Sequence, residues 1–399
     1  MIAKIKEFQY NRRDVKAGIL HIGVGNFHRA HEEFFTNHLL KDTDQQERQL
    51  LKDTDEEEWG IHGAMLLPSD ERLYRALKKQ EGEYTLTVCG RDGKDEVYRI
   101  GSLIKLDWAM ENPEAILSAI ADKHIRIITL TVTFPNSMVD RITPATRPED
   151  IERLSHKNGT TDEAPVYCED FIQWVIEDNF IAGRPAWERV GAEFTNDVTA
   201  YENMKLSLLN ASHTLLSYPS FLSGYRKVDD AMHDDRIVRF VRTFMDKDIT
   251  PYVPAPGNTD LELYKQTLVE RFGNRSVSDQ IARLCFDGIS KFPVYVMPNL
   301  IKMIADGADL TRMAYLIAAY RHYLKYTTDD NGQTFDIAEP WLTETDKTLI
   351  ASNNAEDFLA LSAFQSTDLK KADSFVQLYL NMVEAIRQHG AMAVLESII

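Results

Sequence analysis

The sequence predicts an α/β fold, with a doubly wound parallel-sheet domain at residues 1–199 followed by a mainly α-helical domain at residues 200–399. In the first part, short β-prone runs alternate with helical segments, which is typical of a parallel sheet whose strands are joined by helices. From about Tyr201 onward, apolar residues recur at helical spacing. A chain of 399 residues is also long enough for two domains with separate cores.

The first elements follow one another closely. An apolar run at residues 18–22 predicts a strand, and residues 27–40 are expected to form the next helix. A second strand is expected at residues 61–67. Residues 84–89 and 97–103 predict a hairpin around Asp92-Gly93, a favoured turn dipeptide.

The later elements are marked by caps and by periodicity. Asn112 and Pro113 predict the start of a helix that runs to about Lys123, because asparagine caps helices and proline suits their first turn. A β-prone run follows at residues 125–132. Residues 144–199 are expected to be a connection with at least one helix, at residues 169–178. Five long helices are expected in the second half, at residues 204–216, 236–244, 261–272, 277–286 and 310–323.

One short segment is duplicated. The sequence LLKDTD at residues 39–44 recurs at residues 50–55. Two copies do not make a repeat architecture, which needs three or more. We interpret the duplication as an insertion in a surface connection and attach no function to it.

Composition excludes several functional classes. With 45 Lys+Arg against 62 Asp+Glu, the chain carries a net charge of −17, which argues against nucleic-acid and anionic-membrane partners. Three scattered cysteines predict thiols in a reducing compartment. No apolar run is long enough to span a bilayer and no signal core is visible, so a cytoplasmic location is expected. The histidines lack metal-site spacing, and no metal is expected.

A glycine-containing turn is the first candidate site. Gly23-Val24-Gly25 follows a predicted strand and precedes a predicted helix, as in turns that bind a dinucleotide pyrophosphate. His28 replaces the third glycine, so an ordinary strand–turn–helix remains an alternative. Asp70 and Glu71 follow the second strand, where an acid can bind a ribose 2′-hydroxyl and disfavour a 2′-phosphate.

A polar stripe on a helix is the second candidate. At 100° per residue, Glu202, Lys205, Asn210 and His213 share one side of the predicted helix. A partly buried lysine can act as a general base. A solvated helix face with an ordinary Glu/Lys pair is the alternative.

Three stretches together resemble one family. Residues 18–31 (GILHIGVGNFHRAH), 134–144 (FPNSMVDRITP) and 204–213 (MKLSLLNASH) are similar to signatures of the long-chain polyol (mannitol) dehydrogenases, especially the mannitol 2-dehydrogenases. The resemblance implies a Rossmann-like domain and zinc-independent, NAD-dependent oxidation of mannitol to fructose, with ketose reduction as the reverse reaction. A small-molecule polyol or ketose would be the partner.

The resemblance also implies roles for individual residues. Lys205 would be the general base, Glu202 would lie on the proton's exit path, Asn210 would bind the oxyanion and His213 would position the reacting oxygen. The residues expected to line the polyol site are Asp140, Arg283 and Lys291. The residues expected to bind the cofactor are Gly23, Gly25, Asn26, Phe27, His28, Arg29 and Asp70.

The chain departs from the family pattern at one point. In the family a long stretch separates the strand at residues 125–133 from the FPNSMVDR motif, whereas here Thr133 is followed directly by Phe134. The missing stretch would contain later strands of a doubly wound sheet and a second oxyanion-binding asparagine. We therefore expect a truncated sheet, shortened near residues 133/134, and at most weak activity.

Two alternatives remain open from the sequence. The first is another substrate of the same family, such as a different polyol or fructuronate. The second is a catalytically impaired relative that only binds nucleotide. The sequence does not determine the oligomeric state and is compatible with a monomer.

Overall fold

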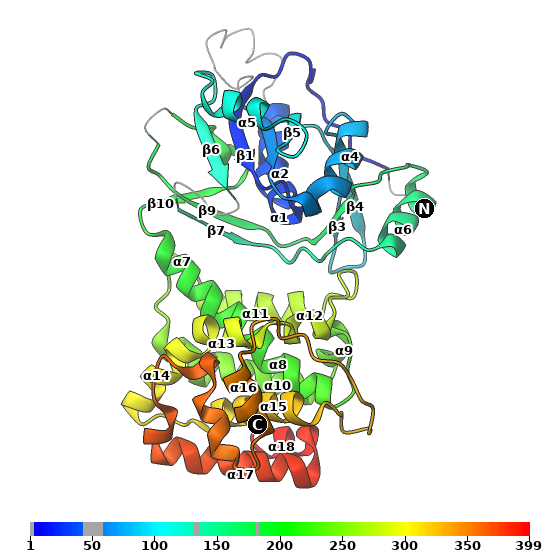
Figure 1. The fold of residues 1–399 in the computed structure, drawn as a ribbon. Coiled ribbons are helices and arrows are strands. Elements are labelled where there is room, and N and C mark those ends of the chain that lie inside the picture. Colours follow the sequence, from blue (N-terminus) through cyan, green and yellow to red (C-terminus); the bar gives the residue numbers. More distant parts are fainter. Residues whose placement is uncertain (1–3, 43–58, 131–135, 181–182) are drawn as a thin grey trace. The chain divides into compact units, whose positions relative to one another are not determined.

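The computed structural model describes residues 4–42, 59–130, 136–180 and 183–399. These form two compact units, Met1–Val198 and Thr199–Ile399 (Figure 1). The second copy of the duplicated segment and the Thr133–Phe134 junction lie outside the described residues.

A four-stranded parallel sheet forms the centre of the first unit. Its strands are β1 (Ala17–Ile22), β2 (Gly60–Met65), β5 (Leu103–Trp108) and β6 (Ile127–Leu130). Their order is β5-β2-β1-β6, and each neighbouring pair is parallel. The order reverses between β1 and β6, as in a doubly wound sheet. The predicted α/β class is therefore confirmed.

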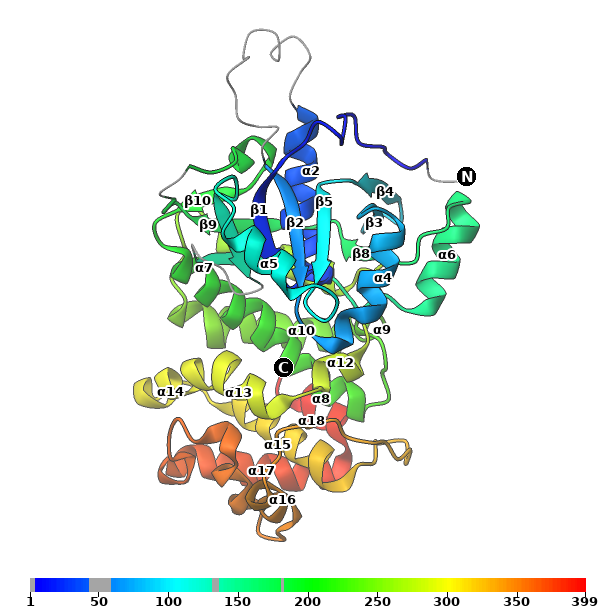
Figure 2. The same cartoon turned by 45° about the horizontal axis from the view of Figure 1, so that its top comes forward.

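Helices cover both faces of this sheet (Figure 2). On one face are α1 (Asn26–Ala30), α2 (Glu32–Asp42) and α4 (Glu71–Lys79); on the other is α5 (Pro113–Ile120). Alternate residues of β1 divide between the faces: Ile19 belongs to the core beneath α2, and Leu20 packs with Ile116 of α5. Both faces are therefore apolar, as a parallel sheet requires.

Two smaller sheets complete the first unit. The first has the order β4-β3-β8, with β3 (Tyr84–Cys89), β4 (Asp95–Ile100) and β8 (Val166–Glu169). The second has the order β10-β9-β7, with β7 (Ser137–Asp140), β9 (Gln173–Glu177) and β10 (Glu193–Thr195). The helix α6 (Pro148–Asn158) lies between β7 and β8 and so connects the two sheets. Of the 3₁₀ turns, Pro68–Asp70 lies between β2 and α4, and Trp187–Val190 lies between β9 and β10. The predicted hairpin is confirmed, with β3 antiparallel to β4.

The helix expected at residues 169–178 is wrong. These residues are the end of β8 and the strand β9, which lies between β7 and β10. Trp174, Val175 and Ile176 are all buried, so this strand shows no apolar–polar alternation. The single helix expected at residues 27–40 is also interrupted, because His31 leaves helical geometry at φ −123° and ψ −88°.

The second unit is mainly helical, as predicted. Its α-helices are α7 (Val198–Lys205), α8 (Ala211–Leu222), α9 (Val228–Ala231), α10 (Asp235–Thr243), α11 (Leu261–Phe272), α12 (Ile281–Cys285), α13 (Gly288–Tyr295), α14 (Met297–Asp306), α15 (Thr311–Tyr326), α16 (Glu344–Ala351), α17 (Asp373–His389) and α18 (Ala391–Ser397). Two π-helical segments, Leu206–Asn210 and Phe244–Ile249, interrupt the α-helical pattern. Four 3₁₀ turns are Thr250–Tyr252, Ala355–Ala360, Ser362–Phe364 and Leu369–Lys371.

The core of the second unit is built around the helix α8. Every residue of α8 is buried, and α8 packs against α15, most of which is also buried. A helix that is apolar or small on all sides belongs in a core. The helix expected at residues 277–286 is shorter than predicted, because Ser278 has a left-handed φ of 48° and α12 begins only at Ile281.

Two further sequence expectations concern the thiols and membranes. Cys89, Cys168 and Cys285 are buried thiols, and no disulfide forms within the described ranges. Within the part of the chain that the structure describes, no helix is both long and apolar enough to cross a membrane.

The cap of α5 gives a test of the fold. The Asn112 side chain accepts a hydrogen bond from the Ala115 amide at 3.2 Å, which confirms the predicted cap. Asn112→Ala should lower the free energy of unfolding of the first unit by about 1 kcal/mol. Four of the five tryptophans, at positions 59, 108, 174 and 187, belong to this unit, so fluorescence during urea unfolding reports mainly on it. Ser118→Ala, at an exposed position of α5, is the matched control and should not destabilise.

Candidate active site

The turn after β1 has the backbone that its glycines predict. Gly23 has φ +98°, a conformation that favours glycine, and its amide donates to the Ala64 carbonyl on β2 at 2.9 Å. Gly25 precedes α1 in an extended conformation. The chain thus leaves β1, turns over the end of β2 and enters a helix, which is the geometry of a dinucleotide-binding turn.

Asn26 and Arg29 join this turn to a later part of the chain. The Asn26 amide donates to the Pro144 carbonyl at 3.3 Å and accepts from Arg29 at 2.6 Å. The Arg29 guanidinium is buried, donates to the Ala164 carbonyl and lies 5.1 Å from the centre of the Tyr84 ring. The turn is therefore bonded to the end of the FPNSMVDRITP stretch, and Arg29 is held in the interior.

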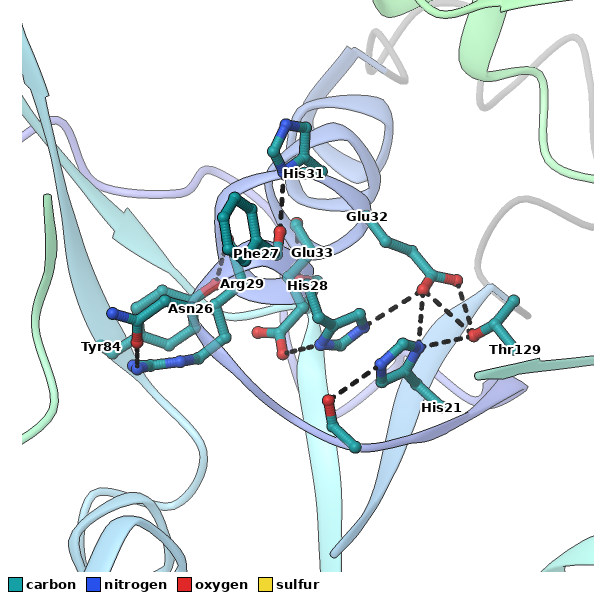
Figure 3. A network of polar contacts seen from close by, with 12 residues as sticks. His21, Asn26, Phe27, His28, Arg29, His31, Glu32, Glu33, Tyr84 and Thr129 are labelled. Atoms are coloured by element: carbon teal, nitrogen blue, oxygen red, sulfur yellow. Dashed lines mark hydrogen bonds and ion pairs between the residues drawn. The ribbon is translucent and has the colours of Figure 1, made fainter. Parts of the chain in front are cut away.

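His28, which replaces the third glycine, stacks on His21 of β1. The ring centroids are 3.3 Å apart and the planes differ by 11°. Figure 3 shows His28 between two carboxylates: Nδ1 lies 3.0 Å from a Glu33 oxygen and Nε2 lies 3.2 Å from a Glu32 oxygen. A third glycine would let the helix α1 approach the strand β1 closely. Here the stacked rings of His28 and His21 lie between the two elements instead.

His21 extends this cluster to the sheet. Its Nδ1 atom lies 3.0 Å from Glu32 and 2.7 Å from the Thr129 hydroxyl on β6 (Figure 3). Its Nε2 atom lies 3.2 Å from the Gly23 carbonyl oxygen. One Glu32 carboxylate therefore connects β1, α1, α2 and β6 at the point where strand order reverses.

The two histidines of the cluster differ in their protonation. Burial alone would lower the pKa of His28, but the Glu33 and Glu32 carboxylates raise it to about 9. Burial and the neighbouring His28 charge lower the pKa of His21. The pKa of Glu32 falls well below its usual range, because contacts to both histidines outweigh its burial. At neutral pH, His28 is an imidazolium and His21 is neutral.

The same residues have a metal-ligand composition but not a suitable orientation. Single ligand atoms of His21, His28 and Glu32 lie within 4.8 Å of one another. Imidazole nitrogens bind metals in the plane of the ring, and two nearly parallel rings stacked at 3.3 Å do not direct both lone pairs at one ion. We therefore interpret this cluster as an ion-paired network, and the absence of a metal stays a prediction.

A pocket of about 100 Å³ adjoins the cluster within the first unit. Phe27, which is 52% exposed, lies at its edge, and Trp174 and Val139 supply apolar wall. His21, His28, His31, Glu32, Leu130 and Ser137 complete the lining. Because β1 and β6 end here, the pocket lies where doubly wound sheets bind their ligands.

Asp70 lies beyond β2 in a short 3₁₀ turn. Its carboxylate accepts from the Leu67 amide at 2.9 Å, and the neighbouring Glu71 pairs with Arg75. Asp70 is therefore fixed on the turn that follows the second strand. The structure does not bring it into the histidine cluster.

In the second unit, Lys205, Asn210 and His213 lie on one continuous but irregular helix. Lys205 ends α7, Asn210 ends the π segment and His213 is in α8. The i→i+5 bonding of a π segment changes the residues per turn, so the 100° spacing assumed from the sequence does not hold between Lys205 and Asn210. Such π segments occur frequently at functional sites.

The surroundings of these side chains differ. Glu202 is exposed and Lys205 is half-buried. Asn210 Oδ1 is buried, and within the described part of the chain it has no hydrogen-bond partner. The His213 ring is buried and stacks on Phe272 at 4.1 Å. A buried amide oxygen without a partner among the described residues, on the same helix as a half-buried lysine, suits a site that binds hydroxyl groups.

Arg283 and Lys291 are brought together in the same unit. Arg283 pairs with Asp279, and the Lys291 ammonium donates to the Leu284 carbonyl at 3.0 Å and the Arg283 carbonyl at 3.3 Å. Burial, followed by the Arg283 charge, lowers the pKa of Lys291. Asp140 belongs to the other unit, where it is buried on β7 opposite Gln173.

Sequence reasoning missed several residues of these sites. Glu32, Glu33 and Thr129 complete the histidine cluster, and the i,i+4 spacing of His28 and Glu32 was the available signal. Glu339 accepts from the Gly288 and Ile289 amides at 2.8 and 3.2 Å and so fixes the start of α13, which carries Lys291. Nothing local in the sequence connects Glu339 with that helix.

Comparison with known families covers both units. The model described as the mannitol dehydrogenase Rossmann domain matches residues 17–131 and 109–189. The model described as the mannitol dehydrogenase C-terminal domain matches residues 197–387.

Individual relatives are similar over nearly the whole chain. The polyol:NADP oxidoreductase of Gluconobacter oxydans is 29% identical, covering 98% of this chain and 97% of that protein. A mannitol 2-dehydrogenase of Aspergillus fumigatus is 28% identical, covering 99% and 95%. The Pseudomonas fluorescens mannitol 2-dehydrogenase, solved with NAD and D-mannitol, is 31% identical with a TM-score of 0.88, covering 98% and 96%. A substrate-free D-sorbitol dehydrogenase is 28% identical with a TM-score of 0.86, covering 99% and 100%.

The alignments also measure how short this chain is. The alignment with the Gluconobacter protein runs over 484 positions while this chain has 399 residues, so at least 85 positions have no counterpart here. The Rossmann-domain model matches in two pieces, and the first piece ends at residue 131. Both findings agree with a stretch missing after Thr133.

The buried imidazolium predicts how stability depends on pH. The pKa of His28 is about 9 in the folded state against 6.5 for a free histidine, so its stabilisation is complete below about pH 6.5 and is lost as pH rises through 9. The free energy of unfolding of the first unit should fall by about 3 kcal/mol across this range. Urea unfolding followed by tryptophan fluorescence at several pH values measures it.

A variant isolates the contribution of this residue. In His28→Gln, the pH slope should disappear, and stability at pH 6.5 should fall by about 3–5 kcal/mol because two buried carboxylates lose their partner. His124→Gln, which changes an exposed histidine paired with Asp122, is the control and should keep the slope. An unchanged slope in His28→Gln would contradict the assignment of the imidazolium.

Proposed function

Because this chain belongs to the mannitol dehydrogenase family, we propose that it is an NAD-dependent oxidoreductase that interconverts mannitol and fructose. The observation that carries the proposal is the π-interrupted helix with Lys205, Asn210 and His213, in a chain that also has the glycine turn of a doubly wound sheet. The helix suits proton transfer, and the glycine turn suits binding of a dinucleotide.

The cofactor proposal rests on the turn at residues 23–29. When bound, NAD supplies the hydride acceptor. Gly23 and Gly25 allow the pyrophosphate to approach the backbone, and the exposed Phe27 ring borders the adjacent pocket. Asn26, His28 and Arg29 hold the turn in place through their contacts with Pro144, Glu32, Glu33 and Ala164. These three residues therefore contribute to cofactor binding by holding the backbone of the turn in position.

The proton is assigned to Lys205. A neutral Lys205 amine would take the proton of the hydroxyl group that is oxidised, while bound NAD would supply the hydride acceptor. The exposed Glu202 carboxylate, one turn earlier on α7, accepts the proton on its way to solvent. In fructose reduction the same lysine returns the proton to the new hydroxyl.

Substrate orientation is assigned to three kinds of group. Asn210 offers a buried amide whose oxygen has no partner among the described residues, and His213 is fixed by its stack on Phe272. Arg283 and Lys291 are donors for further hydroxyl groups, and Asp140 is an acceptor. A polyol with a hydroxyl on each carbon needs such a mixed set.

The shortened sheet limits the expected rate. The second half of a doubly wound sheet forms one wall of the cofactor crevice, and among the described strands the parallel sheet ends at β6. Loss of one of two oxyanion donors costs roughly 10²–10³-fold in turnover. We therefore expect activity well below the typical enzyme value of about 10 per second.

Purified protein and a substrate panel test the proposal. Mannitol, sorbitol and other polyols are supplied with NAD, and fructose and fructuronate with NADH, while absorbance of the reduced cofactor is followed. Slow mannitol oxidation and fructose reduction are expected. Uronate reduction without mannitol oxidation would favour the alternative substrate. NAD binding without turnover of any substrate would favour an impaired, nucleotide-binding relative.

The lysine base gives a specific kinetic prediction. Lys205→Ala should lower kcat by about 10²–10⁴-fold and change KM little, because the lost interaction belongs to the transition state. Lys347→Ala, at an exposed lysine of the same unit paired with Glu344, is the control and should leave both constants unchanged. A defect confined to KM would make Lys205 a binding residue.

Cofactor choice gives a second prediction. Asp70 follows the second strand, where a carboxylate binds a ribose 2′-hydroxyl and repels a 2′-phosphate, so kcat/KM should be higher with NAD than with NADP. Asp70→Ser should reduce this preference about tenfold, which corresponds to about 1.4 kcal/mol. Glu152→Gln, at an exposed position of α6 in the same unit, is the control and should leave the preference unchanged. A preference for NADP, the cofactor in the name of the Gluconobacter relative, would refute the proposal.

A further inference from the structure

Asp287, the residue before α13, has an unusual backbone conformation. Its φ of +57° and ψ of +50° lie in the left-handed region, which glycine adopts freely and other residues adopt at a cost. A residue held in this region persists where its surroundings fix it, and such residues cluster at ligand-binding sites. The conformation of Asp287 therefore needs an explanation in its contacts.

Two contacts from a distant segment fix this turn. The Asp287 amide donates a hydrogen bond to the Ala338 carbonyl at 3.0 Å. The carboxylate of the next residue, Glu339, accepts from the Gly288 and Ile289 amides at 2.8 and 3.2 Å. The segment at residues 338–339 thus holds the backbone of Asp287 and the first turn of α13 together.

The Glu339 contact leaves the Asp287 carboxylate without its usual task. An aspartate at this position normally caps its own helix, since its carboxylate accepts from the amides of the first turn. The Asp287 side chain makes no such bond, and Glu339 accepts from those amides instead. Asp287 Oδ1 is nevertheless buried, and no described residue donates a hydrogen bond to it. A buried carboxylate oxygen without a donor is costly, so a ligand group that donates would be stabilised there.

Lys291 lies one turn further along α13. Its ammonium group donates to the Leu284 carbonyl at 3.0 Å and to the Arg283 carbonyl at 3.3 Å, which uses two of its three donors. Burial and the Arg283 charge lower the pKa of Lys291, while the Asp287 carboxylate acts in the opposite direction, so the two side chains are close enough for their charges to interact. Among the described residues, an acceptor that lacks a donor therefore lies near a cation with one donor unused.

We propose that Asp287 is a further substrate-binding residue, whose carboxylate accepts a hydrogen bond from a polyol hydroxyl group while Lys291 donates one. This assignment rests on the proposed function, in which Lys291 and Arg283 bind the substrate. A hydroxyl group both donates and accepts, so one hydroxyl or two neighbouring ones satisfy both side chains. The left-handed turn and the Glu339 cap keep the Asp287 carboxylate available for this contact.

The charges around Asp287 indicate which class of substrate suits it. Arg283 donates to both carboxylate oxygens of Asp279, and Lys291 lies near Asp287. Two carboxylates therefore already match the two cations. A uronate would bring a further carboxylate, which needs an unmatched cation and is repelled by Asp287. A neutral polyol brings only hydroxyl groups. The arrangement therefore favours mannitol and fructose over fructuronate.

Substitutions at position 287 test the assignment while preserving the fold, because glycine and asparagine both adopt left-handed conformations readily. Asp287→Gly removes both acceptor oxygens. The KM for fructose should rise about tenfold or more with little change in kcat, as expected for a charged hydrogen bond made in both the ground state and the transition state. The thermal unfolding midpoint should stay the same or rise, because glycine relieves the backbone cost. A carboxylate with only a structural role would instead lower that midpoint when removed.

Asp287→Asn tests the charge separately from the shape. Discrimination against a uronate should weaken, so the dissociation constant of fructuronate divided by that of fructose should fall about tenfold or more. Ligand-observed NMR titration in the presence of NAD measures both constants, since neither ketose is reduced by the oxidised cofactor. Thr327→Gly, at another left-handed position with φ +49°, and Asp373→Asn, at an exposed position of α17, are the matched controls. Both controls should leave KM and the two dissociation constants unchanged.

The outcomes separate this assignment from the proposed reaction. Unchanged KM and dissociation constants in both Asp287 variants would overturn the assignment, and so would tighter binding of fructuronate than of fructose by the unmodified chain. A chain that binds fructose, loses this binding in Asp287→Gly and yet turns over no substrate would support the assignment and refute the reaction. A chain that binds neither ketose would overturn both.

Discussion

The first unit depends on a buried charge between two carboxylates. The His28 imidazolium, stacked on neutral His21, connects α1 to Glu32 and Glu33 of α2, and Glu32 continues the contact to Thr129 of β6. A buried pair is costly to desolvate and far costlier to break, because the remaining charge then has no partner. The turn after β1 is therefore fixed by four side chains that cannot be changed independently. A glycine at position 28 would leave them uncompensated.

In the second unit, an irregular helix backbone sets the positions of the candidate site residues. The π segment between Lys205 and Asn210 alters the relative directions of side chains that a regular helix would place differently. Around it, α8 is buried on all sides, so the surrounding packing holds a helix that is not in its most favourable hydrogen-bonding pattern. The proposed cofactor turn thus rests on a charge network, and the proposed proton transfer rests on a helix interrupted by a π segment, each in a separate unit.

The shortened sheet links these local features to the whole molecule. Ending the sheet at β6 keeps the point where strand order reverses, and with it the histidine cluster and its pocket. The same shortening removes one wall of the cofactor crevice and therefore reduces the expected activity.

Residues close together in the chain were enough to predict the α/β class, the cap of α5 at Asn112, the hairpin around Asp92-Gly93 and the glycine turn. An abrupt motif junction also indicated the shortened sheet. The remaining features depend on contacts between distant parts of the chain. Residues 173–177 are a strand because β7 and β10 flank them, Glu339 fixes the start of α13 from 51 residues away, and His28 carries charge because Glu33 and Glu32 surround it. Burial and long-range partners set these outcomes, and neither is a property of a local sequence pattern.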